Sequence, residues 1–329
     1  MRSRSSTLRA AVLAPFTNDV ASSRGSGTAS RLRSHLAAAS LVVSALSVSL
    51  VACTGKGSQS PGAQSTERQS DAEYDLARDL FEKGNPRAAL DHAMKAISLN
   101  EDNDKAQYFV AVIHLSFCST NRGLNTPDCH LSEVEKYARA ALKAKPDFRD
   151  ATNLLGATLV NEKRCKEAIT VLEPLTKDPS YVHPYFAWGN LGDAQLCDGQ
   201  VDAAIVSLKN AVAAEPRFCV GHHRLGLAYE RKNDFSNAEA SFTNAASADP
   251  ACDGLQDAWW GRCRVRQRLS PPNGEWKKDC EKCRDISADT QTGKLCVQTL
   301  GPSGSPAGNS TGDAGAPATA TPHVSSPNP

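Results

Sequence analysis

The residues that could do chemistry in this sequence are its eleven cysteines and a few of its histidines. Cys280-Glu-Lys-Cys283 has the CxxC spacing of zinc sites and of thiol–disulfide exchange centres. No histidine follows it as in a haem attachment site, and no strand pattern surrounds it as in a thioredoxin-like motif. His222 and His223 are adjacent, and adjacent side chains on a helix point about 100° apart, so they cannot chelate one ion together.

Motifs of catalysis are absent from the central part of the chain. It contains no GxSxG, HExxH, P-loop or dinucleotide fingerprint, so we expect no enzyme, no cofactor and no metal. Six of the basic residues fall within positions 1–52, which hold one acid, and the rest of the chain is weakly acidic. No basic stripe is left outside the N-terminal segment, which argues against nucleic-acid binding.

The N-terminal segment reads as a targeting signal. An apolar run over 35–52 follows the basic cluster Arg31-Leu32-Arg33, as in a secretory signal peptide. The run ends in Leu50-Val51-Ala52-Cys53, which resembles the lipobox of bacterial lipoproteins and implies a diacylated Cys53. Thr54 is not the Asp that commonly retains lipoproteins at the inner membrane, so the resemblance implies the outer membrane, facing the periplasm. A plain transmembrane anchor is the alternative, although about 17 apolar residues are short for a span.

These features divide the chain into four parts. Residues 1–52 are the expected signal peptide, although translation could begin later, for example at Val20. Residues 53–69 are expected to be the lipidated cysteine and a flexible Gly/Ser/Gln-rich tether, and 301–329 a disordered Gly/Pro/Ser/Ala/Thr tail. The folded domain is then about 70–300.

The folded part repeats itself every 34 residues. Leu191, Gly192, Ala204, Ala211 and Pro216 recur at 225, 226, 238, 245 and 250 with the same residue types. This resembles the tetratricopeptide repeat, a helix–turn–helix unit in which small residues let two helices approach closely and a proline stops the second. The units are expected at 70–103, 104–148, 149–184, 185–218 and 219–252, the second carrying an 11-residue insertion.

A divergent sixth unit follows, with helices expected near 255–269 and 275–287. The resemblance implies an all-α, right-handed superhelical solenoid of about six tetratricopeptide repeats, whose concave face binds proteins and which carries no chemistry of its own.

The ten cysteines after Cys53 are expected to form five disulfides, because an even number in an exported domain favours pairing. Cys118 and Cys129 bracket the insertion. The repeat register places Cys165 beside Cys197 and Cys219 beside Cys252 on one rim. The pairing among Cys263, Cys280, Cys283 and Cys296 stays open.

The inner face of the repeats supplies the candidate binding groove. Its positions are unusually apolar, which indicates either a hydrophobic groove for a partner segment or packing between helices. In the first case, charged substitutions at Leu115 and Phe186 are expected to abolish capture without unfolding the protein. The groove residues are Tyr74, Phe81, Tyr108, Val112, Leu115, Asn153, Val160, Phe186, Leu196, His223 and Leu227.

The lipobox and the repeats together resemble the pilotins of type IV pilus secretins, including the Tgl-type social motility lipoproteins. The resemblance covers about 50–290 and implies a non-enzymatic scaffold whose partner is a secretin subunit. Two alternatives stay open: a generic repeat lipoprotein of envelope assembly, and a periplasmic thiol or zinc protein that uses Cys280 and Cys283.

Overall fold

The computed structural model describes residues 61–118, 128–269 and 274–301, and this part of the chain is helical throughout. It contains thirteen α-helices and one short 3-10 helix, η1 (Pro250–Gly254). The α-helices are α2 (Pro61–Glu82), α3 (Pro86–Leu99), α4 (Asp104–Cys118), α5 (Leu131–Ala144), α6 (Arg149–Asn161), α7 (Cys165–Thr176), α8 (Pro184–Cys197), α9 (Val201–Ala214), α10 (Cys219–Arg231), α11 (Phe235–Ser247), α12 (Gln256–Leu269), α13 (Trp276–Ile286) and α14 (Gln291–Leu300).

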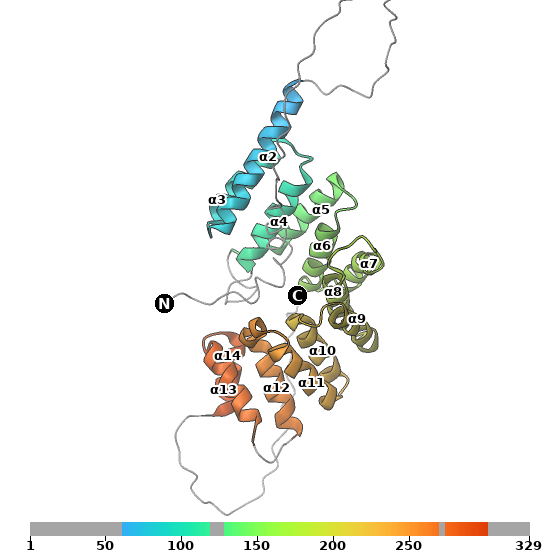
Figure 1. The fold of residues 1–329 in the computed structure, drawn as a ribbon, viewed down its shortest axis with the longest axis vertical. Helices are drawn as coiled ribbons and strands as arrows, with labels where there is room; N and C mark the ends of the chain where they lie inside the picture. The colour runs from blue at the N-terminus through green and yellow to red at the C-terminus, as the bar shows by residue number, and fades with distance from the viewer. Residues whose placement is uncertain (1–60, 119–127, 270–273, 302–329) are drawn as a thin grey trace, which may run out of the picture.

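Consecutive helices form about six pairs, as the 34-residue period predicts. In each pair the first helix packs against the second, and the first helices α2 and α4, and α6, α8, α10 and α12 in turn, also contact one another. The pairs follow a curved path, so that α2–α4 and α12–α14 lie at its two ends and α7–α9 at the bend (Figure 1). The prediction of an all-α tetratricopeptide array is confirmed.

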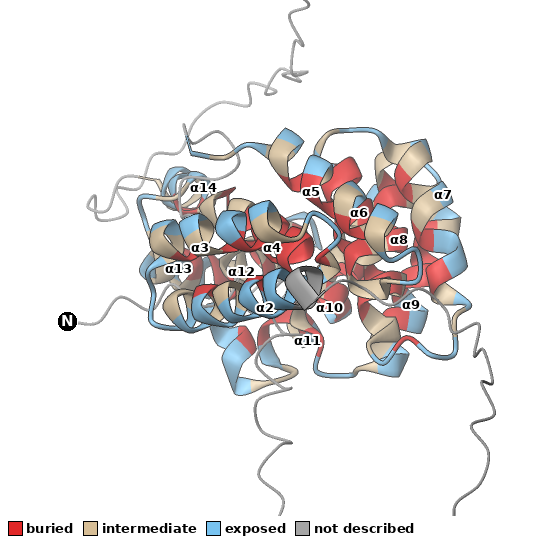
Figure 2. Cartoon of the chain, turned by 90° about the horizontal axis from the view of Figure 1, so that it is seen from above, coloured by how far each residue is buried: buried red, intermediate tan, exposed pale blue. Residues whose placement is uncertain are grey.

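Small residues at the helix crossings bring the two helices of a pair into contact. Ala89, Ala168, Ala204 and Ala238, one in the second helix of each of four pairs, are fully buried. Larger side chains such as Leu172, Leu208 and Phe242 are also fully buried and fill the space between the helices. The buried surfaces therefore face inward between the helices, while the outer faces are exposed (Figure 2).

The turns inside four of the pairs share one backbone geometry. Gly84, Lys163, Gly199 and Asn233 occupy the same repeat position, and all have positive φ, at 82°, 63°, 80° and 61°. In each turn the next amide bonds back to the helix, for example Arg164 N to Leu159 O at 2.9 Å and Gln200 N to Gln195 O at 2.8 Å. This is the Schellman arrangement, which favours glycine or asparagine at the left-handed residue. Lys163 is the exception.

The observed helices differ from the expected ones at both ends of the array. Helix α2 begins at Pro61, so residues 61–69 are helical and do not belong to a flexible tether. Proline suits the first turn of a helix, and Ser70 Oγ donates to Ala96 O at 2.8 Å, which fixes the segment on α3. At the other end, α14 adds a third helix to the sixth unit, which the sequence analysis did not predict.

Five disulfides reinforce the array. They join Cys118 to Cys129, Cys165 to Cys197, and Cys219 to Cys252, which are the pairs that the insertion and the repeat register predict. Cys263–Cys280 and Cys283–Cys296 resolve the pairing that the sequence left open, and they tie α12 to α13 and α13 to α14.

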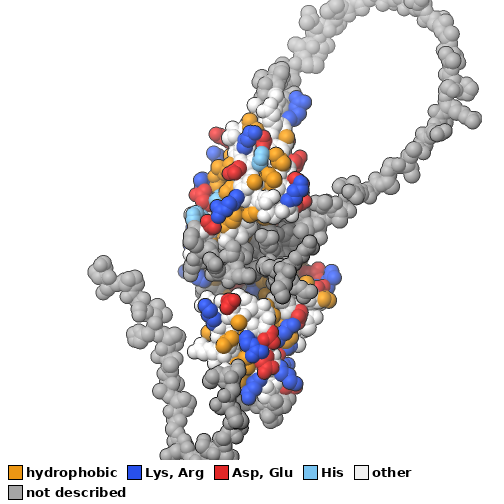
Figure 3. Space-filling view, turned by 90° about the vertical axis from the view of Figure 1, so that its left-hand side faces the viewer, with side chains coloured by type: hydrophobic (Ala, Val, Ile, Leu, Met, Phe, Trp, Pro, Cys, Tyr) orange, Lys and Arg blue, Asp and Glu red, His pale blue; other side chains and the backbone are white. Residues whose placement is uncertain are grey.

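The signal peptide, Cys53 with its lipobox, and the tail beyond residue 301 lie outside the described residues. Within the part that is described, no helix is both long and apolar enough to cross a membrane. On the face of Figure 3, charged side chains of both signs are interspersed with scattered hydrophobic ones over both ends of the array.

Candidate protein-binding groove

Six of the eleven predicted groove residues are buried, so they are not a solvent-facing stripe. Tyr108, Val112, Leu115, Val160, Phe186 and Leu196 are at most 9% exposed. The reason is packing between neighbouring first helices and the turns that precede them. The ring of Tyr108 lies 4.9 Å from that of Phe148, and the ring of Phe186 lies 5.6 Å from that of Phe218. Leu115 and Phe186 therefore cannot be probed as exposed sites.

The other five predicted residues are half-buried: Tyr74, Phe81, Asn153, His223 and Leu227. Tyr74 and Phe81 do not reach a shared groove, because both rings pack edge-on against Phe109, at 5.8 and 5.5 Å between centroids. The structure therefore brings together only part of the predicted set.

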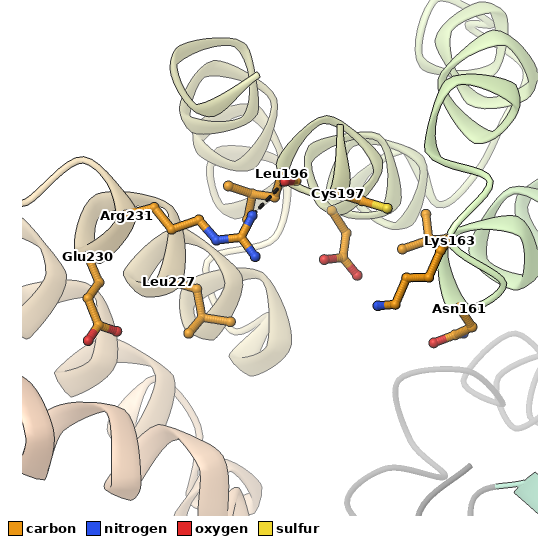
Figure 4. Close-up of a pocket in the computed structure, with 9 residues that line it drawn as sticks. Asn161, Lys163, Leu196, Cys197, Leu227, Glu230 and Arg231 are labelled. Carbon is orange, nitrogen blue, oxygen red and sulfur yellow. Dashed lines mark hydrogen bonds between the residues drawn. The ribbon is translucent and has the colours of Figure 1, made fainter. Parts of the chain in front are cut away.

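Val160, Leu196 and Leu227 do meet, in a pocket of about 350 Å³ on the first helices of units three, four and five. The pocket lies where α6, α8 and α10 end, and Figure 4 shows the side chains of these three helix ends around one space. Its remaining lining residues are Asn161, Lys163, Asp193, Cys197, Glu230 and Arg231. Three apolar side chains thus line a site together with charged residues.

The acidic residues of this pocket are already neutralised. Asp193 Oδ2 lies 3.3 Å from Arg224 Nη2. Both carboxylate oxygens of Glu230 accept from Arg264 of the next unit, Oε1 from Nε at 2.7 Å. Neither carboxylate is therefore left to attract a cation.

The basic residues of the pocket are not matched in the same way. Arg231 donates from Nη1 to the Leu196 carbonyl at 2.5 Å, a neutral acceptor (Figure 4). Lys163 is exposed and forms no ion pair with any described residue. The pocket therefore combines an apolar lining with two basic residues that have no carboxylate partner among the described residues, beside two acidic residues that arginines outside the lining hold.

A row of polar side chains runs beside the pocket across the same three first helices. Asn190 Nδ2 donates to Asn153 Oδ1 at 2.9 Å, and Arg224 Nη1 donates to Asn190 Oδ1 at 2.9 Å. His223, next to Arg224, has its pKa lowered, mainly because burial disfavours the imidazolium. These bonds link units three, four and five and fix the spacing of the helices that form the pocket.

The cysteine and histidine motifs do not form a reactive centre. Cys280 and Cys283 are bonded to different partners, Cys263 and Cys296, so the CxxC offers no free thiolate pair. His222 shares a 2.9 Å hydrogen bond with the Pro216 carbonyl, which satisfies its ring. Over the described residues, no group of three or more His, Cys, Asp or Glu side chains could hold a metal ion.

Sequence reasoning missed all four charged residues that line the pocket: Lys163, Asp193, Glu230 and Arg231. The repeat pattern emphasises the packing positions, whereas these residues lie near the end of a first helix or just after it. Lys163 carried a readable signal, because it stands where the equivalent turns have glycine or asparagine.

The helix pairs, the crossing residues and the turn geometry define a tetratricopeptide-repeat fold. A family model described as "Tetratricopeptide repeat" matches residues 221–252, which is nearly the whole of the fifth unit. No curated protein matches the sequence.

Among solved structures, the chain is similar to PilW, described as a "widely conserved type IV pilus biogenesis factor". The TM-score is 0.57 at 19% identity, over 69% of this chain and 97% of that one. It is also similar to Pseudomonas aeruginosa pilF (TM-score 0.55, 14% identity, 70% and 97% coverage) and to a tetratricopeptide repeat protein from Parabacteroides merdae (0.55, 12%, 70% and 84%). At these identities the likeness shows the fold.

Proposed function

We propose that this protein is a non-enzymatic scaffold, anchored to the outer membrane through a lipid on Cys53, that holds a segment of a type IV pilus secretin subunit during assembly. The observation that carries the proposal is the pocket across α6, α8 and α10, which offers apolar contacts on the inner, first helices of the array. Curved repeat arrays bind partners along such a face.

Three further observations support this assignment. The lipobox ending at Cys53 follows a basic and apolar leader. Five disulfides favour an oxidising compartment outside the cytoplasm. One of the similar structures, PilW, is described as a type IV pilus biogenesis factor.

The anchor is tested by Cys53→Ser. We expect the variant to leave the membrane fraction, as a soluble or unprocessed form, because the thiol that would carry the lipid is gone. Normal membrane retention with normal processing would contradict the anchor without touching the groove.

The groove is tested by Leu227→Glu, which places a charge in the pocket at a half-buried position. Capture of purified secretin subunit should fall strongly while the circular dichroism spectrum stays unchanged. The matched control is Val206→Glu on α9, where the side chain is 60% exposed and outside the pocket. Equal capture by both variants would contradict the proposal.

A generic envelope-assembly scaffold is the second candidate, and the same disulfides and lipobox support it equally. For such a scaffold, Cys53→Ser should still release the protein from the membrane fraction. Leu227→Glu should still weaken capture, but of a partner other than a secretin. Capture of secretin subunit by the wild-type protein separates the two.

A further inference from the structure

The turn after α6 breaks the local rule that its three equivalents obey. Gly84, Gly199 and Asn233 suit a left-handed backbone, whereas Lys163 at φ 63° carries a long side chain with a Cβ. A residue of this kind in the left-handed region costs free energy relative to glycine, and such positions cluster at functional sites. Of the four left-handed residues in these turns, Lys163 is the one that lines the pocket.

The charge balance of the pocket gives the second, independent observation. Asp193 lies 3.3 Å from Arg224. Glu230 accepts hydrogen bonds from Arg264 on both of its carboxylate oxygens. Lys163 has no ionic partner among the described residues, and Arg231 makes only a hydrogen bond to a backbone carbonyl. Positive charge in a concave site with apolar walls attracts an anionic group.

The apolar lining indicates that the anionic group belongs to a ligand that also has an apolar part. Val160 is 9% exposed and Leu196 is 4% exposed, so half-buried Leu227, packed beside them, offers most of the apolar surface, which a free inorganic anion would not use. A volume of about 350 Å³ accepts the side chains of a short segment and lies at the small end of ligand pockets. The complementary ligand is therefore an apolar side chain with a carboxylate close by.

We infer that Lys163 is a specificity-determining residue, and that the pocket accepts a short peptide segment of the partner in which an apolar residue lies next to an aspartate, a glutamate or a C-terminal carboxylate. This inference rests on the proposed scaffold function and names the chemistry of its ligand. Leu227, with Val160 and Leu196 beside it at the bottom of the pocket, takes the apolar side chain, and Lys163 and Arg231 face the carboxylate.

The first test is selection of a random heptapeptide library on the purified full chain. Wild-type protein should enrich peptides that combine Leu, Ile, Val or Phe with Asp or Glu. The Lys163→Glu variant should lose the acidic preference and enrich Lys or Arg in its place. Enrichment without acidic residues, identical enrichment by both proteins, or no enrichment at all would overturn the inference.

The second test measures affinity for one enriched peptide and for its twin with Asn or Gln in place of the acids. Wild-type protein should bind the acidic peptide about threefold to tenfold more tightly at low salt, with the difference shrinking as salt is added. Lys163→Gln and Lys163→Gly should abolish the difference, whereas Lys166→Gln, an exposed lysine outside the pocket, should keep it. An acidic preference that survives both Lys163 variants would overturn the role of Lys163.

Stability separates this role from a structural one. Lys163→Gly should leave the Tm equal or raise it, because glycine relieves the left-handed backbone, even though the acidic preference is lost. Gly84→Lys, which places lysine in the equivalent turn of the first unit, should lower the Tm. A large fall in Tm for Lys163→Gly would mean that Lys163 stabilises the fold.

Failure of this inference can be distinguished from failure of the proposed function. If wild-type protein captures the secretin subunit and Lys163→Glu captures it equally well, the scaffold stands and the acidic recognition is wrong. If wild-type protein binds acidic–apolar peptides but not the secretin subunit, the recognition stands and the secretin assignment is wrong.

Discussion

Gly192 on α8 lies directly against Leu208 on α9: a Cβ added to the glycine would stand 2.5 Å from the Leu208 Cγ. Gly156 and Leu172 in the third unit, and Gly226 and Phe242 in the fifth, show the same close approach, at 2.4 and 2.7 Å. Because both partners of each pair are buried, the leucine or phenylalanine has little room to move. The glycine therefore sets the distance between the two helices of each unit.

Gly192→Ala is expected to lower the free energy of unfolding by about 1–2 kcal/mol, because overpacking outweighs the gain in helix propensity. Denaturant unfolding measures it. Asn244→Ala, an exposed position in α11, is the control and should be neutral or slightly stabilising. A Gly192→Ala protein as stable as wild type would show that the helices separate at no cost.

Charged substitutions at Leu115 and Phe186 are expected to destabilise the protein by about 4 kcal/mol or more, or to prevent folding. Both side chains are buried, at 8% and 5% exposed, so an aspartate there would be an unpaired charge in the core. Val206→Asp on the outer face of α9 should change stability by about 0.5 kcal/mol or less. Thermal unfolding of the three variants makes the comparison, and unchanged stability in Leu115→Asp would contradict the observed packing.

Acidification is expected to destabilise the protein through His222, which is buried, and His223, which is half-buried. Burial lowers the pKa of His222 and of His223 below 6.5, so the unfolded chain binds protons there at a higher pH than the folded chain. Their contribution is fully present above pH 6.5 and is lost as the pH falls through the lowered values.

The measurement is an NMR titration of the His223 ring together with unfolding between pH 7 and 5. We expect an apparent pKa below 6.5 and a shallower loss of stability in His223→Gln than in wild type. A His223 pKa at or above 6.5, with the same pH dependence in both proteins, would contradict the assignment.

All ten cysteines after Cys53 are expected to be oxidised in the native protein. In a Cys53→Ser chain, mass spectrometry before and after reduction should differ by ten hydrogens, two for each of the five bonds. Replacing Cys118 and Cys129 together by serine should cost about 2–3 kcal/mol, the loop-closure entropy of an 11-residue separation. Four free thiols with bound zinc would instead support a metal site at Cys280 and Cys283.

The repeat period was readable because it reflects packing that every unit repeats. Gly192 and Gly226 recur 34 residues apart because the same helix crossing recurs, and the cysteine pairs follow from that register. The burial of Phe186 was not readable, because it depends on Phe218 of the next unit and on the angle between units. Helix α14 was missed for a similar reason: a two-helix repeat has no place for a third helix, and α14 is held by the Cys283–Cys296 bond.

The candidate site was readable only in part. Val160, Leu196 and Leu227 follow from repeat positions that point inward. Whether Lys163 or Arg231 is matched by a carboxylate depends on contacts such as Glu230 with Arg264, which lie 34 residues apart in the sequence.

Site-specific photo-crosslinking in cells tests the central claim most directly, because it reports which surface touches the partner. A crosslinking amino acid at Leu227 lies in the pocket of α6, α8 and α10, and one at Val206 lies on the outer face of α9. We predict a crosslink to the secretin subunit from Leu227 and none from Val206. A secretin crosslink from Val206 alone, equal crosslinks from both positions, or none from Leu227 would contradict a scaffold that works through this groove.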